Sequence, residues 1–347
     1  MNAEKLLQWY DDNHRTLPWR SDPTPYHVWL SEIMLQQTRV EAVREYYLRF
    51  LETLPTVADL AASPEDVCLK LWEGLGYYSR VRNLRKAAIA VMEHYNGQIP
   101  GTKEELEKLP GIGSYTASAI ASIAFGQRTP SVDGNLLRVY ARLFCSPEPL
   151  HAKGLRQKAE AFYRAEIPPD RPGDFNQAMM DLGATVCLPT GNPLCDRCPL
   201  SGECLAHQKG RETAYPVPEP AKVRPVTDLT VFLLRKTDTA GNVLTAVRRR
   251  PPHGLLAGLY EFPNAEGKLS VKEARQLVTA AGLTPGTVRR LPPAKHIFTH
   301  REWHMTGYEI AVTGEAIPDA RLQFLTRECI REQTSVPSAF SAYMERL

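Results

Sequence analysis

The sequence lacks any hydrophobic run long enough to span a bilayer, and its first residues contain no apolar core of a signal peptide. We therefore expect an intracellular, cytoplasmic protein without a membrane partner. A strong net charge is also missing, because 42 Lys and Arg against 39 Asp and Glu leave a formal charge of +3. A nucleic-acid partner would thus require basic residues gathered on one face. No internal repeat or low-complexity tract is present, and 347 residues suffice for two domains with separate cores.

The cysteines do not form the even, dispersed set expected of a disulfide framework. There are seven, and four of them lie close together with seven, two and five residues between them: Cys187, Cys195, Cys198 and Cys204. Four thiolates at this density suit zinc or an iron–sulfur cluster. Zinc sites usually pair two short knuckles, whereas only one two-residue interval occurs here. The spacing therefore favours an iron–sulfur cluster in a reducing compartment.

Strand-like alternation is also absent from the first part of the chain, where the apolar pattern predicts helices. At the centre of this part lies the stretch 109–117, in which Gly111 and Gly113 flank one isoleucine. A capping-box sequence that starts at Thr102 opens a helix before it, and a helix rich in Ala, Ser and Ile follows. We interpret residues 104–125 as helix, tight glycine hairpin and helix.

Such a hairpin directs backbone N–H groups outward at a helix N-terminus, with no side chain in the way. An anion fits there, and the phosphate of a nucleic-acid backbone is one such anion. The alternative is a plain turn between two helices. After the second helix, Asp133 precedes Gly134, where a chain can approach a ligand closely.

A second acid, Glu32, lies inside a helix predicted over residues 26–36. A lone acid on a helix usually faces solvent. Glu32 differs because its neighbours are apolar and because Gln36, Gln37 and Thr38 follow it. Side chains of these types at a helix end can reach base edges or a nucleic-acid backbone.

The stretch 71–84 combines glycines, adjacent tyrosines and two arginines at the start of a predicted helix. Tyr77 could stack on a base and Arg80 could hold a phosphate. The alternative is a packed loop between helices, with the tyrosines in the core.

The composition changes at residues 209–225, where Pro, Glu, Lys and Arg predominate, and we interpret this segment as an extended, stiff linker. Beyond it the apolar period becomes that of strands. A capping box at Ser270 opens one helix that ends near Ala281. Strand patterns occur at 227–234, 243–248, 294–300 and 303–312. The second domain is therefore predicted to be α+β.

Taken together, these features resemble adenine DNA glycosylases of the MutY type over nearly the whole chain. The motifs that carry the resemblance are the segments 29–38, 74–80, 109–117, 132–135 and 254–263 and the four clustered cysteines. Several are shared with the wider helix-hairpin-helix glycosylases, including endonuclease III, whereas the second domain and residues 35–38 single out the adenine branch. The resemblance implies an all-α helix-hairpin-helix domain at 1–208 with a cluster loop at 187–204, the linker at 209–225, and a Nudix-like α+β domain at 226–347.

The family implies a bacterial base-excision repair enzyme that flips adenine out of duplex DNA when it is opposite 8-oxoguanine or guanine. By the resemblance, Glu32 is protonated when substrate arrives, and it donates to N7 of adenine. Asp133 stays ionised and stabilises the oxocarbenium-like sugar, while Tyr115 and Asn135 position Asp133. Because Tyr115 occupies the place of the lysine found in lyase-competent relatives, we expect a monofunctional glycosylase that leaves the strand uncut.

The resemblance also implies the contacts to DNA, made by a monomer. Tyr77 and Gln37 wedge into the duplex beside the oxidised guanine. The hairpin binds a phosphate together with a bound monovalent cation. Four cysteines hold a structural 4Fe-4S cluster, and basic residues of the adjoining loop, such as Arg197, contact DNA.

Two features depart from the family pattern. The interval between Cys187 and Cys195 contains seven residues where the family usually has six, and Gly191 and Pro193 lie within it. Leu137 occupies a position where some relatives carry a lysine that base release does not require.

In the second domain, the family reads 8-oxoguanine through a loop that corresponds to Phe298, Thr299 and His300. The helix that binds magnesium in Nudix hydrolases has Glu273 and little else acidic here, so we expect no pyrophosphohydrolase activity. An ordinary hairpin is the alternative interpretation of the loop.

Two other functions are compatible with parts of the pattern. An endonuclease III-like glycosylase would act on oxidised pyrimidines, but Tyr115 and the second domain argue against it. A catalytically silent, cluster-bearing DNA-binding protein would not need both Glu32 and Asp133.

Overall fold

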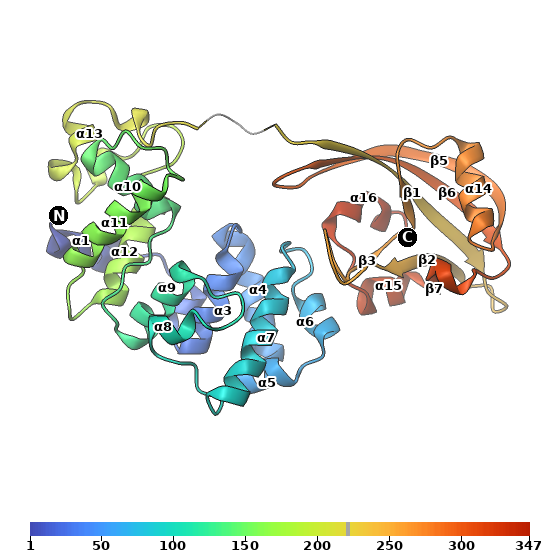
Figure 1. Cartoon of the computed structure of the whole chain (residues 1–347), viewed down its shortest axis with the longest axis horizontal. Coiled ribbons are helices and arrows are strands. Elements are labelled where there is room, and N and C mark those ends of the chain that lie inside the picture. The colour runs from blue at the N-terminus through green and yellow to red at the C-terminus, as the bar shows by residue number, and fades with distance from the viewer. Residues whose placement is uncertain (220–222) are drawn as a thin grey trace. The chain divides into compact units, whose positions relative to one another are not determined.

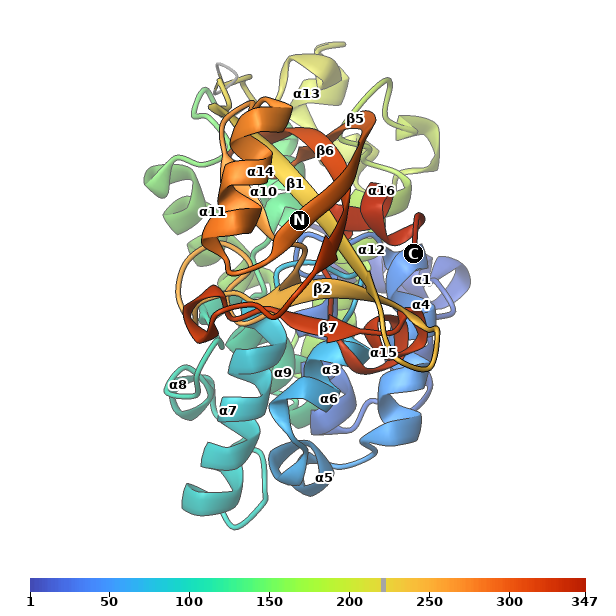
Figure 2. The same ribbon diagram turned by 90° about the vertical axis from the view of Figure 1, so that its right-hand side faces the viewer.

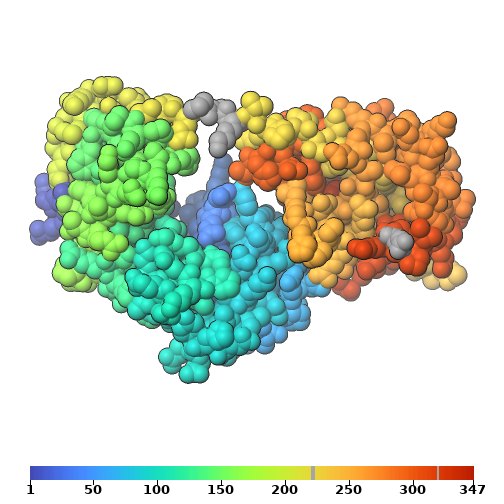
Figure 3. Space-filling view, viewed as in Figure 1, coloured from blue at the N-terminus to red at the C-terminus, as the bar shows by residue number. Residues whose placement is uncertain are grey.

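The structure is a computed structural model that describes residues 1–219 and 223–347, except for the side chain of Asp319. Figure 1 follows the chain from its N-terminus to its C-terminus, and the residues outside the described part are grey in Figure 3. The chain divides into two compact units. The first comprises Met1–Ser63 and Ser79–Ala221, and the second comprises Pro64–Tyr78 and Lys222–Leu347.

The first unit is built from helices, as predicted for an all-α domain. After its last long helix come short 3-10 turns, η1 (Cys195–Arg197), η2 (Ser201–Glu203) and η3 (Glu212–Ala214). Its helices are α1 (Ala3–Asn13), α2 (Pro18–Ser21), α3 (Pro25–Leu35), α4 (Val40–Thr53), α5 (Val57–Ala62), α7 (Ser79–His94), α8 (Lys103–Leu106), α9 (Ser114–Phe125), α10 (Gly134–Phe144), α11 (Lys153–Glu166), α12 (Pro172–Thr185) and α13 (Leu205–Gln208).

Local signals in the sequence set where these helices begin. The Thr24 side chain accepts the N–H of His27, and Pro25 occupies the first turn of α3. At α8 the Thr102 side chain accepts the N–H of Glu105, so half of the predicted capping box forms. The Glu105 carboxylate, which would complete the box, is hydrogen bonded to Tyr95 and Lys108 instead.

The core of the first unit lies where α10, α11 and α12 meet the N-terminal helix. Leu6, Leu7 and Tyr10 of α1 are buried with Phe175 and Met179 of α12. Helix α9 packs against both α3 and α12. These contacts fix the last turn of α3, the first turn of α9 and the start of α10 with respect to one another.

The second unit is a twisted sheet with helices on its two faces, which is the predicted α+β class. The strand order is β3-β2-β1-β6-β5, with β4 paired to β1 and β7 paired to β2. Strands β1 and β6 are parallel, and the other pairs are antiparallel. Its elements are α6 (Glu65–Leu71), β1 (Val226–Thr237), β2 (Val243–Arg249), β3 (Tyr260–Glu261), β4 (Asn264–Glu266), α14 (Val271–Ala280), β5 (Thr284–Ile297), β6 (Glu302–Thr313), η4 (Pro318–Ala320), β7 (Gln323–Leu325), α15 (Arg327–Gln333), η5 (Ser338–Phe340) and α16 (Ser341–Met344).

Alternate residues of β1 supply two separate cores, one on each face of the sheet. Phe232 and Leu234 are buried with Val278 of α14. Leu229 and Val231 face the opposite side and belong to the core that contains residues of α15, η5 and α16. Figures 1 and 2 show α14 along one face of the long strands and the C-terminal helices on the other.

The predicted domain boundaries need two changes. Residues 64–78, which we assigned to the helical domain, group with the sheet. The predicted linker also begins later than residue 209, because Arg142 donates to the carbonyls of Glu212 and Tyr215 and His151 N–H donates to Glu219. Pro220 and the two residues after it lie outside the described part of the chain.

Among the helices that the structure describes, none combines the length and the apolar character needed to cross a bilayer.

Candidate active site

The four side chains predicted to carry the chemistry line one pocket of about 210 Å³. Glu32 comes from the last turn of α3 and Tyr115 from the first turn of α9. Asp133 is the N-cap of α10, and Asn135 is in the first turn of that helix. Residues about 100 positions apart in the sequence thus face one cavity. Apolar side chains, Leu17, Val28, Leu35 and Met180 among them, form much of its wall.

Glu32 has an environment suited to a proton donor at neutral pH. Its side chain is buried, and its Oε2 atom has no hydrogen-bond partner among the residues that the structure describes. Burial raises the pKa of Glu32 to about 7; the nearby Asp133 charge adds to this rise, whereas the Tyr115 hydroxyl and Arg20 oppose it. A carboxyl group with this pKa holds its proton in a large fraction of molecules at pH 7.

Asp133 is held by hydrogen bonds that favour its charged form. Its Oδ1 accepts the N–H of Leu136 at 2.8 Å, and its Oδ2 accepts the Asn135 amide at 2.8 Å. Burial raises the pKa of Asp133, while these hydrogen bonds and the Arg138 charge restrain the rise. An anion held in this way at a helix N-terminus can stabilise a positive charge that develops nearby.

Tyr115 lies between the two acids, although it does not act on Asp133 by a hydrogen bond. Its hydroxyl lowers the pKa of Glu32, and it lies 3.9 Å from Sδ of Met180. Burial, with both carboxylates nearby, raises the pKa of Tyr115 well above its ordinary value. The tyrosine therefore remains a neutral hydroxyl and contributes no amine to the site.

Sequence analysis did not identify two arginines that also line this pocket, Arg15 and Arg20. Both bind Asp181, which is fully buried: Arg15 Nε lies 2.7 Å from its Oδ1, and Arg20 Nη1 lies 2.7 Å from its Oδ2. Burial opposes the charge of Asp181, but the Arg20 and Arg15 contacts hold its pKa below the ordinary value. This triad fixes two cations at the pocket, and the wide spacing of its members in the sequence concealed it.

A hydrogen-bond chain connects Asp133 to the cysteine loop. The Asn135 amide that donates to Asp133 accepts from Arg138 Nη2 at 2.8 Å. Arg138 also donates to the carbonyls of Gly183 at 2.7 Å and Cys187 at 2.9 Å. Because Arg138 is buried and its donors are shared among these partners, it locks the start of α10 to the end of α12 and to the loop beyond.

The four predicted ligand cysteines lie together around this loop as free thiols. Three of them, Cys187, Cys198 and Cys204, pack against the core of α10, α11 and α12. Arg142 Nη1 donates to Cys187 Sγ at 3.1 Å. Burial raises the pKa of Cys195 to about 11 and that of Cys198 to about 12, and the other thiols add to both shifts.

This donor set fits a metal–sulfur group. Backbone N–H groups of Leu200, Ala206 and His207 point at sulfur atoms of Cys198 and Cys204. Together with the Arg142 guanidinium, they supply N–H···S contacts of the kind that stabilise sulfur ligated to iron. Beside the loop, Cys195, His207 and Glu212 place one donor atom each within 4.8 Å of one another.

The polar residues after α3 differ in how they are placed. Gln37 is exposed and has a positive φ of 57°, so its side chain is directed away from the helix. Gln36 donates to Thr116 at 3.2 Å, and the Thr38 hydroxyl bonds to the Gln36 carbonyl and to Arg80. Gln37 is therefore the best placed of these three residues to reach a ligand.

Our assignment of Arg80 as a phosphate-binding residue needs correction. The side chain is buried, and Nη1 donates to the carbonyls of Ile33, Met34 and Gln36 at 2.9, 2.8 and 2.7 Å. These carbonyls end α3 and have no partner within the helix. Arg80 thus supports the segment that presents Gln37, and it is not directed at a ligand.

The hairpin has the geometry that its glycines predicted. Gly111 has a φ of +79°, and a Cβ there would lie 2.6 Å from Cβ of Asn83. Gly113 is the N-cap of α9 with no side-chain hydrogen bond at that cap, and a Cβ there would meet nothing within 4 Å. The first N–H groups of α9 are therefore open to an anion.

The remaining predicted contact residues are at the surface. Arg197, in η1, is exposed. Tyr77 has a positive φ of 48° and is 44% exposed, whereas Tyr78 is buried, so the alternative of a core tyrosine holds for Tyr78 alone. Within the second unit, the Tyr77 hydroxyl is hydrogen bonded to the Thr299 hydroxyl.

The loop predicted to read the damaged base is a tight turn between β5 and β6, closed by a bond from Phe298 N–H to the Arg301 carbonyl at 2.9 Å. Phe298 packs on Trp303 with ring centroids 4.8 Å apart. Thr299 and His300 are exposed at the tip. The aromatic residue thus anchors the turn, whereas the two polar residues lie at the exposed tip, where the Thr299 hydroxyl is bonded to Tyr77.

Two acids of the second unit, Glu273 and Glu261, make structural contacts. Glu273 accepts from Ser270 at the start of α14, which completes the predicted capping box. Glu261 is buried and paired with Arg248 at 2.8 Å and with Arg250. These contacts support the expectation that this domain does not hydrolyse pyrophosphates, and that expectation stays a prediction.

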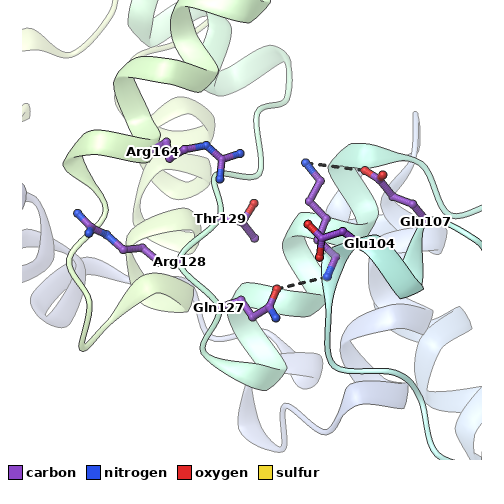
Figure 4. Close-up of a pocket in the computed structure, with 7 residues that line it drawn as sticks. Glu104, Glu107, Gln127, Arg128, Thr129 and Arg164 are labelled. Atoms are coloured by element: carbon purple, nitrogen blue, oxygen red, sulfur yellow. Dashed lines mark hydrogen bonds and ion pairs between the residues drawn. The ribbon is translucent and has the colours of Figure 1, made fainter.

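A second hollow of about 490 Å³ lies among α8, the turn after α9, and α11 (Figure 4). Several of its charged groups have partners: Lys103 lies 3.8 Å from Glu107, and Arg128 Nε donates to the Ile167 carbonyl at 2.5 Å. Its described lining residues include none of the predicted site residues. We therefore assign the chemistry to the pocket that contains Glu32 and Asp133.

Comparisons with known proteins show the families that the two units resemble. Residues 30–164 match the family model of the HhH-GPD superfamily base excision DNA repair proteins, and residues 230–346 match that of the NUDIX domain. The structure resembles a thermostable thymine-DNA glycosylase with a TM-score of 0.55 and 27% identity, over 60% of this chain and 95% of that one. It resembles endonuclease III in a non-covalent DNA complex with a TM-score of 0.51 and 26% identity, over 60% of this chain and 94% of that one.

Several adenine DNA glycosylases are similar to large parts of this chain. The adenine DNA glycosylase of Rattus norvegicus is 35% identical over 98% of this chain and 77% of its own length. That of Homo sapiens is 36% identical over 89% of this chain and 67% of its own length. That of Buchnera aphidicola subsp. Schizaphis graminum is 37% identical over 64% of each. With a helix-hairpin-helix unit, a Nudix-like unit and relatives of this similarity, the chain belongs to the adenine DNA glycosylases, a family of DNA N-glycosylases.

Proposed function

We propose that this protein removes adenine from duplex DNA where the adenine is opposite 8-oxoguanine or guanine, and that it leaves the strand uncut. One observation carries the proposal: Glu32, a buried carboxyl group whose Oε2 atom is bonded to none of the described residues, shares a pocket with Asp133, whose two carboxylate oxygens each accept a hydrogen bond. Hydrolysis of a glycosidic bond uses such a pair of unlike acids.

The two acids divide the work. Protonated Glu32 donates to N7 of the flipped adenine, so that the base departs without a full negative charge. Asp133 stabilises the oxocarbenium-like sugar that remains, and Glu32, now ionised, accepts a proton from the attacking water. Arg15 and Arg20, which Asp181 holds in place, contribute donors along the wall that faces the base.

Recognition of duplex DNA falls to residues outside this pocket. Endonuclease III, which shares the fold of the helical unit, has been solved in complexes with DNA. We assign Gly111 and Gly113 to a backbone phosphate, with a monovalent cation at the hairpin. Gln37 and Tyr77 enter the duplex, with Gln36 and Thr38 behind Gln37. Arg197 contacts a phosphate beside the cysteine loop.

Reading of the opposite base belongs to the loop at Phe298, Thr299 and His300. The oxidised guanine differs from guanine by a carbonyl at C8 and a proton on N7. A hydroxyl and an imidazole next to those atoms can distinguish the two bases by hydrogen bonds. We propose further that the protein works as a monomer in the bacterial cytoplasm, where its thiols stay reduced.

A cleavage assay tests the proposed function directly. On a duplex with adenine opposite 8-oxoguanine, we expect an abasic product whose strand breaks only after hot alkali. Tyr115 has no amine with which to form a Schiff base, so strand scission by elimination is not available to it. Efficient scission without alkali by lyase-free protein would overturn the monofunctional assignment, and release of an oxidised pyrimidine instead of adenine would favour the endonuclease III-like alternative.

We propose that Cys187, Cys195, Cys198 and Cys204 hold a 4Fe-4S cluster. When bound, the cluster braces the loop and performs none of the base-release chemistry. The cysteines fit it because their sulfurs accept N–H groups and the Arg142 guanidinium. Through Arg138 and Asn135, the order that it gives to the loop would extend to the start of α10.

Iron analysis checks this assignment. We expect the purified protein to be yellow-brown, with about four irons per chain. Cys198→Ser should lose the colour and the folded helical unit, because the loop would lose a ligand that ties it to the core. Cys329→Ser, in α15, is the matched control and should keep its iron. One zinc and no iron in the wild-type protein would contradict the cluster.

A further inference from the structure

A helical segment of the second unit is hydrogen bonded to the backbone of that unit's C-terminal part. Lys70, near the end of α6, donates to the carbonyls of Arg331 and of Thr334, the latter at 3.1 Å. Glu73, which follows α6, accepts the N–H of Val336 at 2.9 Å. Lys70 and Glu73 also bind each other at 2.5 Å. We call these two side chains and their three backbone partners the α6 clamp.

The α6 clamp meets groups that need partners. The Arg331 and Thr334 carbonyls lie at the C-terminal end of α15, where helix carbonyls lack intrahelical donors. Thr334 and Val336 are buried. An ammonium group on carbonyls and a carboxylate on an N–H satisfy both kinds of backbone group at once, and each contact is charge-assisted.

The segment that the α6 clamp holds, Pro64–Tyr78, contains Tyr77 near its end. Its hydroxyl is bonded to Thr299, at the tip of the β5–β6 loop. Phe298, next to it, packs on Trp303, and Trp303 lies in the same core as Ile330 and Val336. The α6 clamp thus bonds the segment before Tyr77 to residues next to this core, and the β5–β6 loop, which is bonded to Tyr77, packs on the same core.

We propose that Lys70 and Glu73 are positioning residues that set Tyr77 against Thr299 and thereby determine how well the enzyme distinguishes 8-oxoguanine from guanine opposite adenine. The inference rests on the proposed function, in which Tyr77 and Thr299 meet the opposite base. Neither residue of the α6 clamp lines the pocket of Glu32 and Asp133. Their loss should therefore alter recognition more than chemistry.

The contacts with the backbone matter more here than the attraction between the two charges. An ion pair three residues apart on a partly exposed helix contributes little by itself. The exposed pair Asp66–Arg249, also in this unit, gives a contrast: Arg249 Nη2 lies 2.7 Å from Asp66 Oδ1, and the bond from Arg249 Nε to the Gly258 carbonyl does not depend on Asp66. Exchange of the two charges of the α6 clamp separates these effects.

The test compares three variants of the full chain: Lys70→Met with Glu73→Gln, the exchanged Lys70→Glu with Glu73→Lys, and the control Asp66→Asn. The measurement is the ratio of dissociation constants for duplexes with uncleavable 2′-fluoroadenosine opposite guanine and opposite 8-oxoguanine. We expect a roughly tenfold smaller ratio in the first two variants and no change in the control. The exchanged variant keeps an ion pair but places a carboxylate on carbonyls and an ammonium on an N–H, so it should not recover.

A double-mutant cycle gives a readout that stability alone would not change. In the wild-type background, Tyr77→Phe and Thr299→Val should be coupled in the binding ratio; in the exchanged background that coupling should disappear. Excision of adenine opposite guanine at saturating enzyme should proceed at the wild-type rate in the exchanged variant. Amide hydrogen exchange at Val336 should become faster in it, which reports the broken contact even if the fold loosens.

Two outcomes distinguish a failure of this inference from a failure of the proposed function on which it rests. If Thr299→Ala lowers the ratio while the exchanged variant keeps both the wild-type ratio and the Tyr77–Thr299 coupling, the α6 clamp does not position the reader and the inference is wrong. If Thr299→Ala and His300→Ala leave the ratio unchanged, the loop does not read the opposite base and the proposed recognition fails first.

Discussion

Glu32→Gln is expected to reduce the single-turnover rate of adenine release by about 10²–10⁴-fold, while binding of the mispaired duplex persists. Glutamine keeps the shape of the side chain and can accept a hydrogen bond, but it has no proton to transfer. The wild-type carboxyl group is buried, and none of the described side chains is hydrogen bonded to its Oε2 atom. A neighbour bonded to Oε2 is therefore not there to supply the proton in place of Glu32. A rate near that of the wild type would remove Glu32 from the mechanism.

The same residue predicts a pH dependence. Because Glu32 must be protonated to donate, and because its pKa is raised to about 7, the wild-type rate should fall as the pH rises through about 7. The residual rate of Glu32→Gln should lack this limb. Rates measured under saturating enzyme from pH 5.5 to 9 would show both profiles, and a wild-type rate that increases across this range would contradict the assigned role.

Glu32→Gln should raise stability at a pH at which it lowers activity. The folded-state pKa of Glu32 lies above its ordinary value of 4.5, so the folded protein holds a proton that the unfolded chain releases. The contribution of the Glu32 proton to the free energy of unfolding is therefore fully present below pH 4.5. It is lost as the pH rises to about 7, by an amount on the order of 3 kcal/mol. Glu32→Gln avoids this loss and should melt at a higher temperature than the wild type at pH 8. A variant that melts at a lower temperature would indicate damaged packing.

Local patterns in the sequence were sufficient for much of the fold and for the two acids. The helix at Glu32, the glycine hairpin and the capping box at Ser270 all depend on neighbours within a few residues, and the structure forms each of them. Family membership and the two-part fold are confirmed by the comparisons. Convergence of Glu32 and Asp133 could be expected only through the resemblance, because local periodicity does not report which helices meet.

Features that depend on distant partners could not be predicted. Asp181 binds two arginines more than 160 positions away, and no local pattern distinguishes it from a surface acid. The sequence predicts a phosphate contact for Arg80 because it lies with glycines, tyrosines and a second arginine at the start of a helix. In the structure, its guanidinium donates to the carbonyls at the end of α3. Residues 64–78 have a helical sequence, and their place with the sheet depends on contacts such as those of Lys70 and Glu73 with residues 331–336.

The packing of the first residues of the predicted linker was not foreseen for a related reason. Proline-rich sequence favours extended backbone, but it does not exclude packing along a domain surface. Two backbone carbonyls before Pro216 are used by Arg142, whose position on α10 is fixed by the helical core. Sequence composition therefore located the change of domain but placed its first boundary too early.

Asp133→Asn is the second substitution from which we expect a large loss, about 10²–10³-fold in the single-turnover rate. Its size follows from the removal of charge, because most of the local structure should survive. Asparagine is as good an N-cap as aspartate, and its oxygen can still accept the N–H of Leu136. The melting temperature should therefore change little, whereas the developing positive charge on the sugar loses its anion.

This substitution should also alter Glu32. The Asp133 charge contributes to the raised pKa of Glu32, so its removal should lower that pKa and move the falling limb of the pH profile to lower pH. Asn135→Ala is the graded control: it removes the 2.8 Å hydrogen bond to Asp133 but leaves the charge, and it should cost about tenfold. Asp133→Asn with a wild-type rate and an unmoved profile would reduce Asp133 to a helix cap. The expected order, wild type above Asn135→Ala above Asp133→Asn, with a shifted profile only in the last, would identify its charge as the group that stabilises the sugar.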